Sequence, residues 1–123
     1  MEIIKTDKAP AAVGAYSQGI KTGNFIFTSG QLPINPETKE LYKEIKEATK
    51  QSLLNVEAIV KEAGASKENI VKCTVFLADV NDFEAFNAVY EEFFGEHKPA
   101  RSAFQVGAVP KGAPLEIEAI AEL

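Results

Sequence analysis

The spacing of apolar residues changes repeatedly along the chain, and this succession of spacings constrains the fold more than any single motif. Residues 71–77 alternate with period two, which is typical of a strand. The face that we expect to be buried holds Val71, Cys73, Val75 and Leu77. Residues 41–63 instead carry apolar or small side chains at helical spacing, and Gly64 follows as a suitable terminator. The sequence therefore predicts a long helix followed by a strand.

A second helix is predicted over residues 81–94, where aromatic residues recur at helical spacing. Asn81 and Glu84 have the spacing of a capping box at its start. The remaining strands are predicted at residues 3–4, 16–20, 24–29 and 115–121, and from residue 100 onward. The order β-β-β-α-β-α-β-β predicts an α+β fold in one domain over residues 1–123, with a mixed sheet and both helices packed on one face.

The strand predicted at residues 24–29 has no polar face. Phe25 and Phe27 lie on one side, and Ile26 and Thr28 lie on the other. A strand with one face in water normally alternates apolar and polar residues. We therefore expect both faces of this strand to be covered.

Composition disfavours several functional classes. The formal net charge of −5 argues against binding to a nucleic-acid backbone, which requires a basic face. Cys73 is the only cysteine, so no intrachain disulfide is possible, and we interpret it as a packed core thiol rather than a nucleophile. His97 is the only histidine and is interpreted as a solvated loop residue, so no usual cluster of metal ligands is present. No apolar run is long enough to span a membrane and no signal segment is evident, so we expect a cytoplasmic protein.

Arg101 is the one cation in a mostly apolar run from residue 100 to residue 110. Its planar fork of donors can hold a carboxylate with two parallel hydrogen bonds. The strand predicted at residues 115–121 brings Glu116 and Glu118 to one face. If the two strands are neighbours, a cation for binding and a carboxylate for chemistry lie close together. The alternative is an edge-strand arginine that pairs with a glutamate for structural reasons alone.

Three further polar features stand out from their surroundings. Asn87 occupies the apolar stripe of the second helix, so it either ties the helix to a loop or contacts a ligand. Tyr16 follows two small residues and either roofs a small pocket or covers a sheet edge. Ser29 and Gly30 end a strand, where backbone N–H groups either bind an anion or only form a turn.

These groups limit the available chemistry. No serine or cysteine is paired with a base in a recognisable pattern, and the glycines do not form a phosphate loop. An arginine, one or two carboxylates, a tyrosine and backbone donors remain. This set can bind a small carboxylate and place a water against an electrophilic carbon without a metal or cofactor. It suits a reactive substrate that needs little activation, such as an imine.

Several segments match a known pattern when they are taken together. They are Gly14-Ala15-Tyr16-Ser17-Gln18, Thr28-Ser29-Gly30-Gln31-Leu32-Pro33, Asn81-Asp82-Phe83, Asn87, Tyr90, Phe93-Phe94, Pro99-Ala100-Arg101-Ser102 and Glu116-Ile117-Glu118-Ala119-Ile120-Ala121. They resemble the RidA family of reactive intermediate deaminases, also called the YjgF family, nearly from end to end. The resemblance implies a chorismate-mutase-like α+β fold and a homotrimer whose sheets form a central barrel, with three clefts between subunits.

The resemblance also implies an activity and a set of site residues. The activity is hydrolysis of 2-iminobutanoate and 2-iminopropanoate, or of enamines such as 2-aminoacrylate, to 2-keto acids and ammonia without a cofactor. These intermediates are by-products of pyridoxal-phosphate-dependent dehydratases. Arg101 would hold the substrate carboxylate, and Glu116 would hold and polarise the attacking water. The other substrate-binding positions implied are Tyr16, Ser29, Gly30, Asn87 and the backbone of Ala103.

Two positions depart from the family pattern, and two other functions remain open. Ala103 stands where some members have cysteine, which excludes a thiol role there, and Ala15 stands where proline is common. One alternative is a ligand sensor that uses the same cleft without turnover. The other is an RNA-directed inhibitor of translation, which the net charge of −5 disfavours. Turnover of an imine generated in situ separates an enzyme from a sensor.

Overall fold

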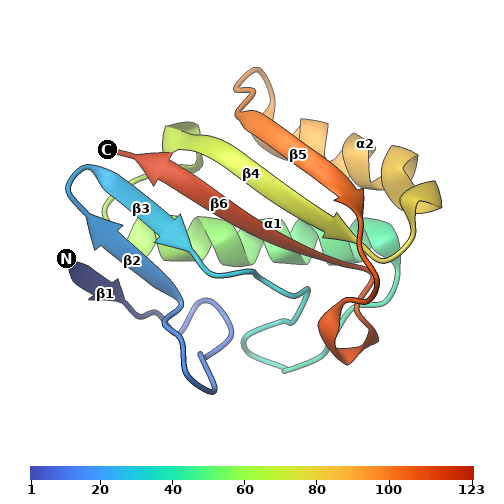
Figure 1. Ribbon diagram of the computed structural model, residues 1–123, viewed down its shortest axis with the longest axis horizontal. Coiled ribbons are helices and arrows are strands. Elements are labelled where there is room, and N and C mark those ends of the chain that lie inside the picture. The colour runs from blue at the N-terminus through green and yellow to red at the C-terminus, as the bar shows by residue number, and fades with distance from the viewer.

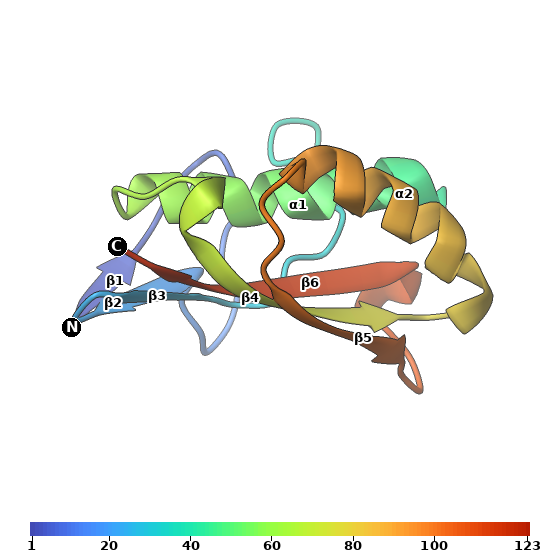
Figure 2. The ribbon, with the colours of Figure 1, turned by 90° about the horizontal axis from the view of Figure 1, so that it is seen from above.

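A six-stranded sheet carries two helices on one of its sides in the computed structural model, which describes all residues from 1 to 123 (Figures 1 and 2). The strands are β1 (Glu2–Ile4), β2 (Gly19–Thr22), β3 (Phe25–Thr28), β4 (Ile70–Leu77), β5 (Ala100–Gln105) and β6 (Leu115–Glu122). The helices are α1 (Ile45–Glu62) and α2 (Phe83–Phe94), and short 3₁₀ turns occupy Lys67–Asn69, Val80–Asp82 and Pro110–Gly112. The predicted order of elements and the packing of both helices on one face are confirmed.

The strands follow the order β1-β2-β3-β6-β4-β5 across the sheet. Only β4 and β5 run parallel, and α2 connects them as a crossover. The last strand, β6, lies between β3 and β4 and pairs antiparallel with both. The crossover places β5 on the outer edge of β4, whose inner edge is occupied by β6. The condition that the strands of Arg101 and Glu116 are neighbours is therefore not met.

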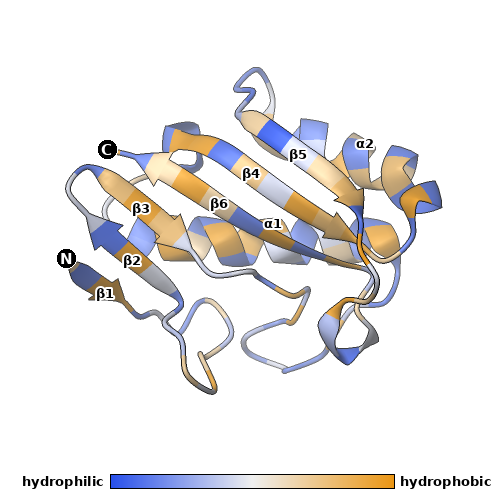
Figure 3. Cartoon of the chain, in the orientation of Figure 1, coloured by the Kyte–Doolittle hydropathy of each residue, from blue (hydrophilic) through white to orange (hydrophobic).

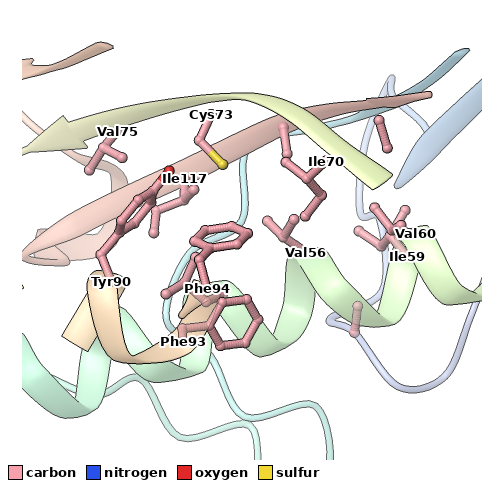
Figure 4. Packing of buried hydrophobic residues seen from close by; sticks show 14 of the residues in the cluster. Val56, Ile59, Val60, Ile70, Cys73, Val75, Tyr90, Phe93, Phe94 and Ile117 are labelled. Carbon is pink, nitrogen blue, oxygen red and sulfur yellow. The ribbon is translucent and has the colours of Figure 1, made fainter. Parts of the chain in front are cut away.

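The core lies between the sheet and the helices (Figure 4). Val56, Ile59 and Val60 of α1 and Phe86 of α2 are fully buried in it. Burial of each large apolar side chain contributes about 1.5–3 kcal/mol to folding. Cys73 of β4 is also fully buried in this layer, so its interpretation as a packed thiol is confirmed.

The second strand begins later than predicted, at Gly19 rather than at Tyr16. The residues before Gly19 form a loop, which the buried side chain of Gln18 holds in place. Its amide oxygen accepts from the Thr6 N–H at 2.7 Å. Its Nε2 donates to the carbonyl oxygens of Thr6 at 3.0 Å and Pro10 at 2.8 Å. The backbone carbonyl of Gln18 also accepts from the Ser29 N–H at 2.8 Å, so the end of this loop is joined to the end of β3.

The first helix begins at Ile45, four residues later than predicted. Tyr42 instead pairs with the loop after β3, because its N–H donates to the Pro33 carbonyl at 3.0 Å. Glu44 caps the helix by accepting hydrogen bonds from two N–H groups of the first turn. These hydrogen bonds lower the pKa of Glu44.

Two details around β4 also differ from the prediction. A bulge between Ile70 and Lys72 turns Val71 outward, where it is 41% exposed, and Ile70 takes the buried position. Asp79 rather than Asn81 caps the turn before α2, since its carboxylate accepts from the Asn81 N–H at 2.9 Å. The predicted capping box is therefore wrong.

No helix covers the other face of the sheet, called here the bare face (Figure 2). Apolar residues run along β3, β4 and β6 (Figure 3). Phe25 and Phe27 of β3 are each 42% exposed on the bare face, and Phe104 of β5 is 46% exposed. The chain by itself therefore covers only one of the two faces of β3 that we expected to be covered.

Candidate functional site

Arg101 extends from β5 toward α2, where an amide and three aromatic rings surround its guanidinium. Its Nη1 donates to Oδ1 of Asn87 at 2.7 Å. Its guanidinium carbon lies 4.8 Å from the ring centroid of Tyr90, 5.4 Å from that of Phe83 and 5.6 Å from that of Phe86. All four partners belong to α2. The helix therefore determines where the cation of β5 lies.

Arg101 forms no ion pair within the chain. The only ion pair with an N–O distance of 4.0 Å or less lies within α1. Within the chain, Arg101 is therefore not paired with a glutamate. Aromatic faces and an amide oxygen attract a cation but do not neutralise it. The remaining donors of the guanidinium make no hydrogen bond within the chain and are available to an anion.

Asn87 lies beside Arg101 and is half-buried. Besides accepting from Arg101, it donates through Nδ2 to Oε1 of Glu91 at 3.1 Å, one turn later. These contacts stay within α2 and β5, so the interpretation of Asn87 as a tie to a loop is wrong. Asn87 and Arg101 border a hollow of about 310 Å³, which Glu91, His97 and Lys98 also line.

A second polar cluster surrounds Glu116 of β6, in a groove of about 700 Å³. Tyr16, Ser29 and Gly30 line the same groove, so the structure brings four predicted site residues together. The Ser29 hydroxyl donates to the Ser17 carbonyl and so fixes the loop beside β3. Tyr16 is 53% exposed and borders the groove, as expected of a residue that roofs a pocket.

Gly30 lies directly against the carboxyl group of Glu116. A Cβ atom added to Gly30 would stand 2.7 Å from both Cδ and Oε1 of Glu116, which is shorter than real side chains allow. The missing side chain therefore lets the carboxylate approach the backbone. The Gly30 N–H makes no hydrogen bond within the chain, so it adds a donor to the groove.

The loop after β3 is fixed by two residues that the sequence analysis did not single out. Gln31 exchanges backbone hydrogen bonds with Ile117 of β6, at 2.7 and 3.2 Å. Asn55 of α1 is fully buried and donates to the carbonyl oxygens of Leu32 at 3.1 Å and Ile34 at 3.0 Å. An amide near the apolar stripe of a predicted helix indicates that a buried polar group needs a partner, but it does not indicate which partner: Asn55 bonds a loop, whereas Asn87 bonds Arg101.

The electrostatic environment of Glu116 favours its protonated form. Burial raises the pKa of Glu116 above its usual value, and the neighbouring Glu118 carboxylate raises it further. Both carboxylates line the groove. A carboxylate with a raised pKa is a stronger base, so Glu116 is better suited than an exposed glutamate to take a proton from water.

Arg101 and Glu116 lie on opposite faces of the sheet. Arg101 is in register with the buried Cys73 and contacts α2, whereas Glu116 is in register with Phe76 on the bare face. In addition, β4 separates their strands. The cation and the carboxylate therefore do not converge within one chain, which corrects the expectation based on neighbouring strands.

Ala103 and His97 both make structural contacts within the chain. Ala103 lies two residues after Arg101 on the same side of β5 and packs against the core. His97 is half-buried, and its Nε2 lies 2.7 Å from the Ile70 carbonyl oxygen, so it is anchored to β4 rather than solvated.

No three His, Cys, Asp or Glu side chains are grouped so that they would hold a metal ion. Neither helix has the length and apolar character needed to cross a bilayer.

Known proteins resemble the chain over nearly its whole length. The family model described as endoribonuclease L-PSP matches residues 6–123. A RutC family protein of Pyrococcus abyssi is 56% identical over 121 residues, which cover 98% of this chain and 95% of the relative. The 2-iminobutanoate/2-iminopropanoate deaminase of Escherichia coli is 52% identical over 121 residues, with coverage of 96% and 94%. The crystal structure of Escherichia coli TdcF with bound serine has a TM-score of 0.97 at 48% identity, and covers 100% of this chain and 99% of that one.

Proposed function

The chain belongs to the endoribonuclease L-PSP family, which is the RidA or YjgF family that its motifs resemble, and from this membership we propose that it hydrolyses reactive 2-imino acids. The substrates are 2-iminobutanoate and 2-iminopropanoate or their enamine tautomers, and the products are 2-keto acids and ammonia. The protein thereby removes by-products of pyridoxal-phosphate-dependent dehydratases. The relative that is 52% identical and named for this deaminase activity supports the proposal.

The observation that carries the proposal is that Arg101 has no ion-pair partner within the chain. Neutral groups hold its guanidinium, and its free donors match the two oxygens of a carboxylate. Every 2-imino acid carries a carboxylate next to its C=N carbon. Serine, which is bound in the TdcF structure, also has a carboxylate on the carbon that bears nitrogen. Arg101 is therefore assigned to the substrate carboxylate.

The site requires more than one copy of the chain. Because Arg101 and Glu116 lie on opposite faces of the sheet, we assign them to one site formed by two subunits. Arg101 and Asn87 of one subunit face Tyr16, Ser29, Gly30 and Glu116 of the next. A homotrimer with a central barrel contains three such clefts and covers the exposed Phe25 and Phe27 of the bare face.

The reaction is an addition followed by an elimination. Glu116 accepts a proton from a water while the water oxygen forms a bond to the C=N carbon and the electron pair of that double bond moves to nitrogen. The proton is passed to the nitrogen, which gives a 2-amino-2-hydroxy acid. The amino nitrogen then takes up a further proton from solvent, the C–N bond breaks, and ammonia leaves with the electron pair of that bond. The C–OH group becomes the ketone as Glu116 takes up its proton, so that one proton has moved in net from the hydroxyl to the nitrogen. Arg101 holds the carboxylate in place throughout these steps.

A coupled assay tests the proposal. A threonine dehydratase supplies the imine in situ, and the rate at which 2-ketobutanoate appears is measured with and without this protein. We expect a faster appearance of the keto acid, which the Arg101→Ala variant does not produce. Binding of 2-ketobutanoate without any acceleration would instead indicate a sensor. Release of fragments from single-stranded RNA, at a rate unaffected by Arg101→Ala, would indicate a nuclease.

A further inference from the structure

The guanidinium of Arg101 rests on the ring of Tyr90 more closely than on any other ring. The distance from the guanidinium carbon to the Tyr90 centroid is 4.8 Å, and Phe83 and Phe86 lie farther away at 5.4 and 5.6 Å. Tyr90 is 6% exposed and extends from α2 toward the sheet (Figure 4). Its ring in turn packs on Phe86 at 5.4 Å and Phe94 at 4.9 Å. The closest face under the cation therefore belongs to a ring that is itself packed.

The hydroxyl group of Tyr90 contributes little to this arrangement. It is buried, and the polar group beside it is the Cys73 thiol, which is only a weak hydrogen-bonding partner. Burial, together with the neighbouring Cys73 thiol, raises the pKa of the phenol, so Tyr90 remains neutral and supplies no negative charge to Arg101. The part of Tyr90 that acts on the arginine is its aromatic face.

A flexible side chain that binds a carboxylate by two parallel hydrogen bonds must be held in one orientation, or binding loses rotamer entropy. Asn87 fixes one end of the guanidinium through a single hydrogen bond at 2.7 Å. The three rings restrict the remaining freedom without occupying the donors that face outward. A carboxylate in place of the rings would fix the arginine equally well, but it would also neutralise the charge that attracts the substrate.

We propose that Tyr90 is a positioning residue for substrate binding: its ring, with those of Phe83 and Phe86, forms an aromatic cradle that orients Arg101 and leaves its charge unneutralised. The proposal deepens the proposed function, because it explains how the carboxylate-binding arginine is prepared. Tyr90 acts through Arg101 and makes no contact with the reacting atoms.

The test compares Tyr90→Leu with Tyr90→Phe, and with Phe93→Leu as a matched control. Phe93 is an equally buried aromatic residue of α2, 5% exposed, but it packs beside Lys50 and Lys67. Loss of the cation–π contact in Tyr90→Leu should raise KM for the imine and the Kd for 2-ketobutanoate by about 2- to 30-fold. Because the contact serves ground state and transition state alike, kcat should change less. Tyr90→Phe should retain both values within about twofold.

The control separates positioning from general destabilisation. Phe93→Leu should lower the melting temperature as Tyr90→Leu does and leave KM and Kd unchanged. An equal rise of KM in both leucine variants, or an unchanged KM in a folded Tyr90→Leu protein, would overturn the proposal. If Tyr90→Leu does not fold, Phe83→Leu removes a half-buried ring of the same cradle and should raise KM in the same direction.

A second measurement does not depend on the enzymatic activity. The experiment follows the Nε–H proton of Arg101 by NMR in the intact protein. The chemical shift of this proton and the rate of rotation about the Nε–Cζ bond both report on the surrounding rings. Both should change in Tyr90→Leu and stay near the wild-type values in Phe93→Leu. If the signal changes in this way while the wild-type protein hydrolyses no imine, the cradle stands and the proposed function fails. If the signal is the same in Tyr90→Leu and wild type, the cradle is refuted whatever the activity.

Discussion

Gly30→Ala should separate the chemistry of the site from the stability of the fold. The added Cβ would stand 2.7 Å from Cδ and Oε1 of Glu116, whereas ordinary contact begins at 3.4 Å, so the carboxylate must retreat by about 0.7 Å. The backbone of Gly30 does not have a positive φ, and the obstructing atoms are the end of a flexible side chain. The substitution should therefore cost the fold less than about 1 kcal/mol, since the side chain can move aside.

The effect on catalysis should be much larger. Displacement of a catalytic group by about 1 Å lowers the rate by about 10²-fold, so we expect a loss on this order in the coupled imine assay. Gly107→Ala is the matched control, because no atom lies within 4 Å of the added Cβ and its backbone φ is not positive. It should keep wild-type turnover and melting temperature. If a folded Gly30→Ala protein hydrolyses the imine at nearly the wild-type rate, catalysis does not require the Glu116 carboxylate to lie against the Gly30 backbone, and the reasoning is refuted.

Four other outcomes are expected. Arg101→Ala should lower activity in the coupled assay by about 30- to several-thousand-fold, because truncation of one partner of a hydrogen-bonded charge pair costs about 2–5 kcal/mol. Arg101→Lys should restore little of this activity, because lysine lacks the planar fork of donors of the guanidinium. Glu116→Gln should lower turnover by about 10²–10⁴-fold, whereas Glu118→Gln should act mainly on melting or assembly, and the reverse pattern would reassign the water to Glu118. The raised pKa of Glu116 means that the folded state binds the proton of this carboxyl more tightly than the unfolded state does, so ionisation of Glu116 destabilises the fold. Glu116→Gln should therefore be more stable than wild type, by an amount that grows as pH rises from about 4.5 and then levels off. Thermal melts of both proteins between about pH 4 and 8 measure this difference in stability. Native mass spectrometry at micromolar concentration should show mainly trimer, and a monomer would contradict the site between subunits.

The periodicity of the sequence was sufficient for the order of elements, because each helix and most strands are long enough for their own apolar pattern to identify them. It failed where a distant contact decides the local structure. The amide of Gln18 holds a loop, where a strand was predicted to begin, through bonds to residues 8 to 12 positions away. The bulge in β4 exchanges Val71 for Ile70 at the buried position, and only the pairing with β6 reveals it. Such exceptions are not encoded in the spacing of neighbouring residues.

The two halves of the site differ in how far the sequence predicts them. Arg101 and Asn87 are 14 residues apart and are joined by one crossover, so their proximity follows from a helix returning to a parallel strand. Gly30 and Glu116 belong to opposite ends of the chain, and they meet only because β6 inserts between β3 and β4. No spacing rule predicts that insertion. The family resemblance implies roles for Gly30 and Glu116, but it does not indicate that the position of the Glu116 carboxylate requires a glycine at residue 30.

The separation of Arg101 from Glu116 has a physical consequence for the proposed chemistry. A guanidinium and a carboxylate that were adjacent in one folded chain would pair with each other, and the pair would have to break before substrate could bind. On opposite faces of the sheet they cannot pair within the subunit, so aromatic rings hold the arginine and Gly30 accommodates the glutamate. In the proposed trimer the two groups approach only across an interface, with space for the substrate between them. In this arrangement Arg101 remains available to bind the substrate carboxylate, and Glu116 remains available to take a proton from water. In a site built on one face of a single sheet, the two groups would pair with each other instead.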